Sequence, residues 1–419
     1  MPPYPFRIIH HRVPAQHIRE YPRALLNDQE TVLYLDVKQY IPIDNPNPQP
    51  GDVTIIAAHA NGFPKELYEP LWAYLLQKAA KNKFKIRSIW IADLANQGQS
   101  GVLNEDQLGN DPSWMDHARD LLYLINQKRD QMPRPLIGIG HSMGGNQVVN
   151  VALMHPRLFT TLILIDPIIQ VQIAEYAGSN IAQLSTFRRD VWPSRKAATD
   201  SFRSSPFYAA WHPEVFERWC QYGLRDLPTR LHRHDPHGQT PNPVTLTTTK
   251  HNEVFTFLRP IHRADGGYVN RKEHLDLNTS SQPDPHFYRP EPPATFARLP
   301  ELRPSVLYVF GAESPAASPE LCALKMKYTG VGIGGSGGVP DGRVKRVRYD
   351  GVGHLVAMEV PEKTAEDAAT WIGSELERWR QDEDQHNREW KTRPRAERQT
   401  VDEQWKANIG GPPQRGSKL

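Results

Sequence analysis

A candidate nucleophile stands in the segment 140–145, which reads Gly-His-Ser-Met-Gly-Gly. The segment follows the apolar run 136–139 and precedes a helix-like stretch, which is the context that a Gly-x-Ser-x-Gly motif requires. A sharp turn there would lift the Ser142 hydroxyl out of the sheet, and the backbone N–H of Met143 would point to an oxyanion formed beside it. We therefore expect acyl chemistry at Ser142. The alternative is an incidental serine in a glycine-rich turn.

The general base should be a histidine beyond the last strand of the sheet. Among 17 histidines, His354 has this placement, because it ends a glycine-rich segment that follows the apolar run 344–349. The alternative is an ordinary histidine in a surface loop. A second oxyanion donor should come from the loop after the run 53–56, where the N–H of Phe63 is our candidate. His59 in the same loop is expected to brace the loop and not to react.

Two carboxylates compete for the role of the acid that orients the base. The common place for this acid is after the run 306–310, but the chain there reads Gly-Ala-Glu-Ser, with Ser314 where an aspartate would stand. Asp166 ends the strand that follows the nucleophile helix, and we favour it over Glu313. Either carboxylate could accept the ring N–H of the histidine and stabilise its cation. The segment 93–100 is expected only to build a turn.

These side chains need a parallel sheet to bring them together. Several short apolar runs are rich in β-branched residues, and stretches whose apolar residues have helical spacing lie between them. Such an alternation predicts an α/β protein with a doubly wound, mostly parallel sheet. The predicted strands lie at 53–56, 86–92, 136–139, 162–165, 305–310 and 344–349.

The pattern of predicted strands is interrupted in the middle of the chain and resumes later. The core is therefore predicted to be discontinuous in sequence. We expect the core to comprise 1–169 and 303–381, with a large, mainly helical cap at 170–302 and a charged tail at 382–419. The cap should form the pocket for an acyl group. Its basic residues are candidates for contacts with a phosphorylated acyl carrier: Arg188, Arg189 and Lys196.

The composition excludes several classes of protein. Hydrophobic residues make up 38% of the 419 residues, which is ordinary for a globular protein. The net charge of +3 is too small to indicate a nucleic-acid-binding protein. No apolar stretch suits a signal peptide or a membrane span. Cys220 and Cys322 are predicted to be free thiols. No motif indicates a cofactor or a metal site.

The chain closes with Ser417-Lys418-Leu419, the tripeptide that the peroxisomal import receptor reads. We therefore expect this receptor as a partner and the peroxisomal matrix as the location of the protein.

With these motifs placed, the sequence resembles the α/β-hydrolase superfamily. The segments 17–23 and 59–72, the elbow at Ser142, Ile165-Asp166-Pro167 and the terminal tripeptide together resemble a fungal peroxisomal group. That group includes the yeast peroxisomal lipase, hydrolases of host-selective-toxin clusters and the acyl-CoA hydrolase of mycophenolic acid biosynthesis. The resemblance implies the α/β-hydrolase fold, and it supports Asp166 because the acid of this group follows the strand after the nucleophile helix.

The residues and the resemblance together predict a peroxisomal serine hydrolase that cleaves an acyl thioester through an acyl-enzyme, in fungal secondary metabolite biosynthesis. Ser142 would attack, His354 would transfer the proton, and Asp166 would orient His354. A carboxylic ester hydrolase or lipase with the same triad is the first alternative. A non-catalytic binding protein of the same fold is the second.

Overall fold

The computed structural model describes residues 4–171, 175–233, 242–261, 263, 267, 269–270, 272–277 and 286–411. The chain divides into two compact units, 1–373 and 374–419. The second unit contains the exposed end of α13 (Pro361–Thr392) and α14 (Glu403–Ile409). The terminal tripeptide lies outside the described residues. The boundaries that we expect for the cap and the tail stay predictions.

An eight-stranded sheet forms the centre of the first unit, with the order β1-β2-β4-β3-β5-β6-β12-β13. The strands from β4 to β13 run parallel. At one edge β2 pairs antiparallel with β4, and β1 pairs antiparallel with β2. All six predicted strands are present. The strands are β1 (Phe6–Pro14), β2 (Tyr34–Pro42), β3 (Val53–Ala58), β4 (Ile86–Ala92), β5 (Leu136–His141), β6 (Thr161–Ile165), β12 (Ser305–Gly311) and β13 (Val344–Tyr349).

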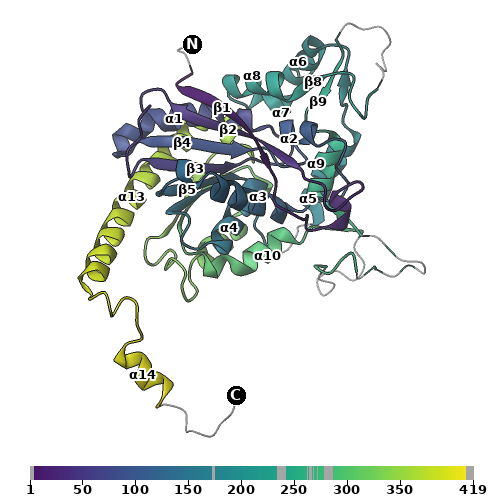
Figure 1. Cartoon of the computed structure of the whole chain (residues 1–419). Coiled ribbons are helices and arrows are strands. Elements are labelled where there is room, and N and C mark those ends of the chain that lie inside the picture. Colours follow the sequence, from purple (N-terminus) through teal and green to yellow (C-terminus); the bar gives the residue numbers. More distant parts are fainter. Residues whose placement is uncertain are drawn as a thin grey trace. The chain divides into compact units, whose positions relative to one another are not determined.

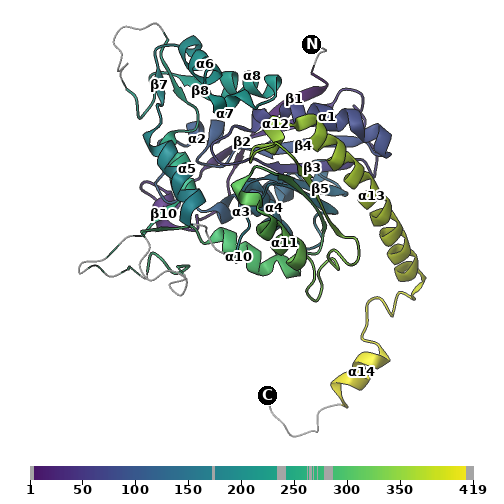
Figure 2. The ribbon, with the colours of Figure 1, turned by 180° about the vertical axis from the view of Figure 1, so that it is seen from behind.

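Helices cover both faces of this sheet. Figure 1 shows α3 and α4 in front of the strands, and Figure 2, seen from behind, shows α1 and the start of α13 in front. Leu121 of α3 and Val148 of α4 belong to one buried core with strand residues such as Ile56. The helices are α1 (Glu69–Ala79), α2 (Gly98–Leu103), α3 (Trp114–Gln127), α4 (Met143–Met154), α11 (Pro319–Tyr328), α12 (Val356–Glu359) and α13. The predicted α/β-hydrolase architecture is confirmed.

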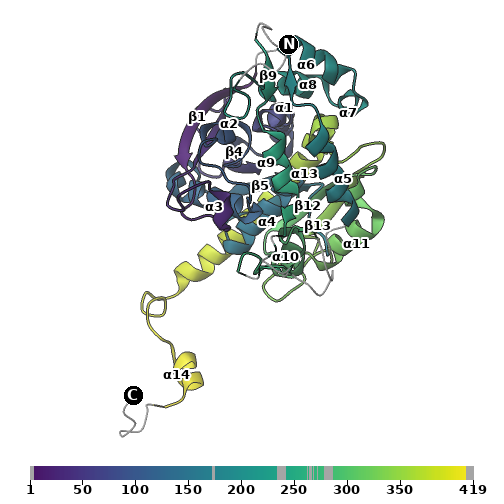
Figure 3. The ribbon, with the colours of Figure 1, turned by 90° about the vertical axis from the view of Figure 1, so that its right-hand side faces the viewer.

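The segment between β6 and β12 carries further helices and small sheets. The helices are α5 (Glu175–Phe187), α6 (Arg195–Arg203), α7 (Pro206–Ala209), α8 (Pro213–Tyr222), α9 (Lys250–Phe257) and α10 (Glu291–Arg298). Figure 1 shows α5 to α9 above and to the right of the large sheet, whereas α10 lies beside α4. Figure 3 shows the same segment from the side. One small sheet joins β7 (Val191–Trp192), β9 (Val244–Leu246) and β8 (Leu224–Asp226), and the other pairs β10 (Arg259–Pro260) with β11 (Phe287–Tyr288). The helices were predicted from the sequence, but these short strands were not.

Two further features are absent from the described residues. No helix among them is long and apolar enough to cross a membrane. They also hold no group of three or more His, Cys, Asp or Glu side chains that could bind a metal ion. Both cysteines are free thiols, as predicted.

Candidate active site

The nucleophile elbow joins β5 to α4. Ser142 has a φ of 57°, a left-handed value that is uncommon for a residue with a side chain. The turn is tight enough to need glycine on both sides: a Cβ on Gly140 would lie 2.4 Å from the carbonyl oxygen of Gly144, and one on Gly144 would lie 2.2 Å from that of Ala58. The elbow places Ser142 at the end of the strand, where only 6% of the residue is exposed to solvent.

Ser142, His354 and Asp166 form a continuous hydrogen-bonded line. Oγ of Ser142 lies 2.8 Å from Nε2 of His354, and Oδ2 of Asp166 lies 2.6 Å from Nδ1 of the same ring. Asp166 is fully buried after β6, while a quarter of the His354 side chain is exposed. A buried carboxylate on Nδ1 leaves Nε2 free to accept a proton from the serine hydroxyl.

The structure separates the two candidates for the acid. Asp166 contacts the His354 ring, whereas the other candidate, Glu313, is exposed to solvent. Ser314, which stands at the common position of the acid, also approaches the ring, with its Oγ 3.4 Å from Nδ1. Its hydroxyl accepts the N–H of Ala316 as well, so it caps the turn that follows β12.

The loop after β3 carries the expected second oxyanion donor. The N–H of Phe63 makes a long turn contact of 3.3 Å with the carbonyl of Ala60. His59 in this loop contacts the carbonyl of Ala60 with Nδ1 and accepts the N–H of Leu94 with Nε2. Burial lowers the pKa of His59, and these two contacts suit a neutral ring with its proton on Nδ1. His59 therefore braces the loop, as expected. Met143, the other expected donor, is the first residue of α4.

The segment after β4 does more than build a turn. The Gln97 side chain accepts the N–H of Gly62 at 2.8 Å and donates to Oδ1 of Asn61 at 2.6 Å. Asp93 accepts the backbone N–H of Lys65 and forms a 2.6 Å ion pair with its ammonium group. All these side chains are buried. They hold the loop that carries Phe63 from both sides, whereas only turn-building was expected of them.

A second chain of hydrogen bonds links the same loop to the base. The hydroxyl of Tyr68 accepts the N–H of Ala60 at 2.9 Å and lies 2.8 Å from Nδ1 of His141. Nε2 of His141 lies 3.0 Å from the carbonyl oxygen of His354 and so donates to it. Burial, aided by the nearby His354, lowers the pKa of His141 to about 3, so the ring is neutral at physiological pH. His141 lies inside the elbow motif, but the motif alone did not indicate this role.

Aromatic side chains of the cap pack on Phe63. Its ring lies 5.7 Å from that of Trp211 and 6.0 Å from that of Trp219, both edge-on. These contacts place an apolar surface next to the expected oxyanion hole. The basic residues that we considered for phosphate contacts already have partners within the cap. Arg188 pairs with Glu253, Lys196 pairs with Asp200, and Arg189 lies over the ring of Trp192.

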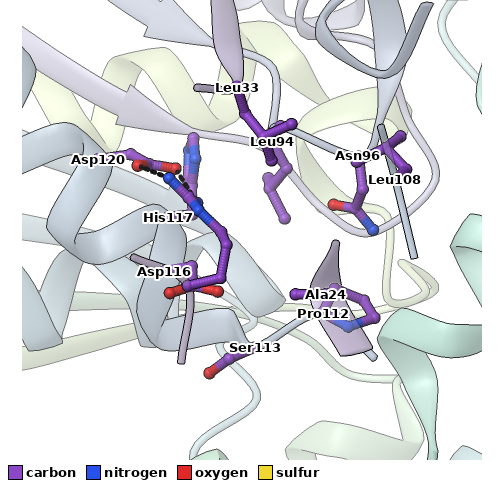
Figure 4. A pocket seen from close by; sticks show the side chains of 12 residues that line it. Ala24, Leu33, Leu94, Asn96, Leu108, Pro112, Ser113, Asp116, His117 and Asp120 are labelled. Carbon is purple, nitrogen blue, oxygen red and sulfur yellow. Dashed lines mark hydrogen bonds and ion pairs between the residues drawn. The ribbon is translucent and has the colours of Figure 1, made fainter. Parts of the chain in front are cut away.

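A small cavity lies beside the segment 94–96 (Figure 4). His117 lines it, and neither ring nitrogen of this residue has a hydrogen-bond partner among the described residues. Burial lowers the pKa of His117 well below its usual value, so the ring is neutral. The volume of about 30 Å³ suits a water molecule but not an acyl chain. The cavity is therefore not the substrate site.

The chain is similar to known proteins over most of its length. Residues 55–368 match the model of the alpha/beta hydrolase family. The type I acyl-CoA thioesterase mpaH' of Penicillium brevicompactum is 44% identical over 420 residues, which is 96% of this chain and 94% of that protein. The abhydrolase domain-containing protein AFT2-1 of Alternaria alternata is 28% identical over 58% of this chain and 84% of its own length.

The fold resembles that of solved structures. The peroxisomal alpha-beta-hydrolase Lpx1 of Saccharomyces cerevisiae superposes with a TM-score of 0.66 at 19% identity, covering 88% of this chain and 89% of its own. This resemblance concerns the fold, while the family match and the 44% identity extend over most of the sequence. The chain therefore belongs to the alpha/beta hydrolase family, and it is a hydrolase.

Proposed function

We propose that the protein hydrolyses acyl-CoA thioesters through the Ser142–His354–Asp166 triad. The hydrogen-bonded line from Ser142 to Asp166 is the observation that carries the chemistry. The 44% identity to type I acyl-CoA thioesterases over nearly the whole chain supports the thioester as substrate.

The geometry accommodates an acyl-enzyme mechanism. Ser142 Oγ attacks the thioester carbonyl while Nε2 of His354 takes its proton, and the N–H groups of Phe63 and Met143 stabilise the oxyanion. His354 then returns the proton to the leaving thiolate. In the second half, His354 takes a proton from water, the resulting hydroxide attacks the acyl-enzyme, and the free acid leaves as Ser142 regains its proton. The aromatic surface around Phe63 suits an apolar acyl group.

We further propose that the protein acts in the peroxisomal matrix, in fungal secondary metabolite biosynthesis. The tripeptide Ser417-Lys418-Leu419 supports the location, since it is the form that the peroxisomal import receptor binds. Fusion of a fluorescent protein to the N-terminus would test it. The full chain should colocalise with a peroxisomal marker, and a chain without the last three residues should remain in the cytosol.

The activity is tested by thiol release from a panel of acyl-CoA esters, beside p-nitrophenyl and glyceryl esters. Thioester turnover that exceeds ester turnover and is lost in Ser142→Ala is the expected result. Ester turnover alone would replace the proposal by a carboxylesterase or lipase with the same triad. Labelling of Ser142 by a fluorophosphonate probe separates both from a non-catalytic binding protein, which would not react.

A further inference from the structure

A helix of the cap lies directly on the loop that carries Phe63. The carboxyl group of Glu253 on α9 packs against the backbone of Gly62, where a Cβ would lie 2.9 Å from both Cδ and Oε2 of that carboxyl. Gly62 has a φ of 84° and immediately precedes Phe63 in the chain. The side-chain amide of Asn61 also donates to the carbonyl oxygen of Glu253 at 3.0 Å. One residue of the cap therefore contacts the loop with both its side chain and its main chain.

A second cap helix holds this carboxylate. Oε1 of Glu253 accepts from the hydroxyl of Ser185 at 2.6 Å, and Oε2 accepts from Nη2 of Arg188 at 2.5 Å. Ser185 belongs to α5, and Arg188 directly follows this helix. The side chain of Glu253 is 8% exposed, and a carboxylate buried to this extent is costly unless donors or an opposite charge replace its water. The place of the carboxylate on Gly62 therefore depends on α5 and its end.

The backbone of α9 is fixed to the core by other contacts. Oγ1 of Thr256, about one turn further along the helix, accepts from the side-chain amides of Gln97 and Asn96, each at 3.1 Å. The helices α9 and α5 contact each other, and Figure 3 shows both in front of the large sheet. Loss of the Glu253 side chain would thus leave α9 anchored by Thr256, while the backbone of Gly62 would lose its contact with the carboxylate.

We propose that Glu253 is a positioning residue for hydrolysis, whose carboxylate packs on Gly62 and thereby holds the N–H of Phe63 where it stabilises the oxyanion. The cap acts on this donor through Ser185 and Arg188, so it contributes to the stability of the transition state as well as to the pocket for the acyl group. This inference rests on the proposed function, because the role of Phe63 belongs to it. The competing interpretation is that Glu253 only joins the two cap helices and shapes the pocket.

The saturation kinetics of Ser142 labelling by a fluorophosphonate probe test the inference without knowledge of the natural acyl group. The phosphonyl oxygen must be stabilised by the same N–H groups as the oxyanion of an ester. In Glu253→Ala the maximal labelling rate should fall by about tenfold, because a displaced donor affects the transition state most, and the half-saturating probe concentration should change by less than about twofold.

Two further variants serve as controls. Glu253→Gln should keep most of the wild-type rate, since its amide can accept from Arg188 and donate to the hydroxyl of Ser185. Glu217→Ala, at an exposed position on the cap helix α8, should label like the wild type.

The outcomes decide between the two interpretations. A wild-type maximal rate in Glu253→Ala would overturn the inference, and so would a higher half-saturating probe concentration without a lower maximal rate, which would mean that Glu253 only shapes the pocket. A Glu253→Gln variant as slow as Glu253→Ala would also contradict it. If Glu253→Ala does not fold, Arg188→Met removes one donor to the carboxylate at a side chain that is 29% exposed. The maximal rate should then fall by about threefold, and an unchanged rate would overturn the inference.

The same experiment separates this inference from the proposed function. Wild-type protein that does not label at Ser142 would overturn the proposed triad itself. Protein that labels at Ser142 but does not hydrolyse acyl-CoA esters would overturn only the thioester as substrate, and the comparison of the Glu253 variants would still test the inference.

Discussion

The hydroxyl of Ser314 lies 3.4 Å from Nδ1 of His354, the ring nitrogen that Asp166 contacts at 2.6 Å. Ser314 follows β12 and Asp166 follows β6, and the two strands are neighbours in the sheet. Two positions on adjacent strand ends thus converge on one nitrogen. An acid at either position could orient the base, and this chain has its carboxylate at position 166.

This convergence predicts that the acid can be moved. Asp166→Asn should lower kcat by about 10⁴-fold, because the amide favours the wrong tautomer of His354. Adding Ser314→Asp to that variant should recover at least about tenfold in kcat, since the new carboxylate can reach Nδ1. Rates of thioester hydrolysis measure the recovery. Ser318→Asp in the same background is the control, because Ser318 caps α11. A double variant with Ser314→Asp that is no faster than Asp166→Asn would contradict the prediction.

Sequence patterns were sufficient for the strands that are buried on both faces. Runs such as 162–165 are continuous in apolar residues because helices cover both sides of the sheet. The strands β1 and β2 were not predicted, since their polar and apolar residues are mixed and one face of β1 is partly exposed. The small strands of the cap are two or three residues long, too short for any periodicity.

The site was predictable where a motif carries it. Ser142 follows from the elbow and His354 from its place after the last strand. Asp166 was favoured over Glu313 from its place after the next strand and from the family resemblance, and the fold brings Asp166 to the ring. Supporting side chains such as Gln97 could not be found, because their roles depend on contacts far apart in sequence. The hydrogen bond of Gln97 to Gly62 spans 35 residues, and that of His141 to His354 spans 213.

Loss of the Gln97 side chain should impair the proposed oxyanion donor in the loop after β3 more than it impairs substrate binding. Gln97→Ala frees the N–H of Gly62 and the amide of Asn61, so the N–H of Phe63 should no longer be held in place. We expect kcat to fall by about 10- to 100-fold while KM changes little, because a displaced donor affects the transition state most. Steady-state kinetics provide the measurement. Gln99→Ala, at an exposed side chain in the same segment, should be neutral, and an equal loss there would refute the assignment.

The hydroxyl of Tyr68 should contribute to stability. Tyr68→Phe leaves the N–H of Ala60 and Nδ1 of His141 buried without their partner. A buried unsatisfied polar group costs about 1–3 kcal/mol, so the free energy of unfolding should fall by that order. Urea denaturation measures the loss. Tyr123→Phe, at an exposed ring, should change the free energy of unfolding little. Equal stabilities of the two variants would show that the hydrogen bonds of Tyr68 make no net contribution to stability.

Asp116 should make stability depend on pH near neutrality. This residue lines the cavity in Figure 4, and its Oδ1 accepts from the Gln16 side chain and the N–H of Glu20. Burial raises the pKa of Asp116 to about 7, although the nearby Arg19 opposes the shift. In the unfolded chain the pKa returns to about 3.9, so the folded protein holds an extra proton between these values. The stabilisation from this proton is complete below pH 4 and is lost as the pH rises through 7.

Asp116→Asn should remove this dependence, because the amide is neutral at every pH. The wild type should lose about 2–3 kcal/mol of unfolding free energy from about pH 5 to about pH 8 through Asp116, whereas the variant should not. The variant should therefore be more stable relative to the wild type at pH 8 than at pH 5. Denaturant unfolding at the two pH values measures the difference. Asp130→Asn, at a carboxylate whose side chain is 93% exposed, should show no such change. A constant difference between Asp116→Asn and the wild type would mean that the Asp116 carboxyl is already ionised well below neutrality, with Arg19 outweighing burial.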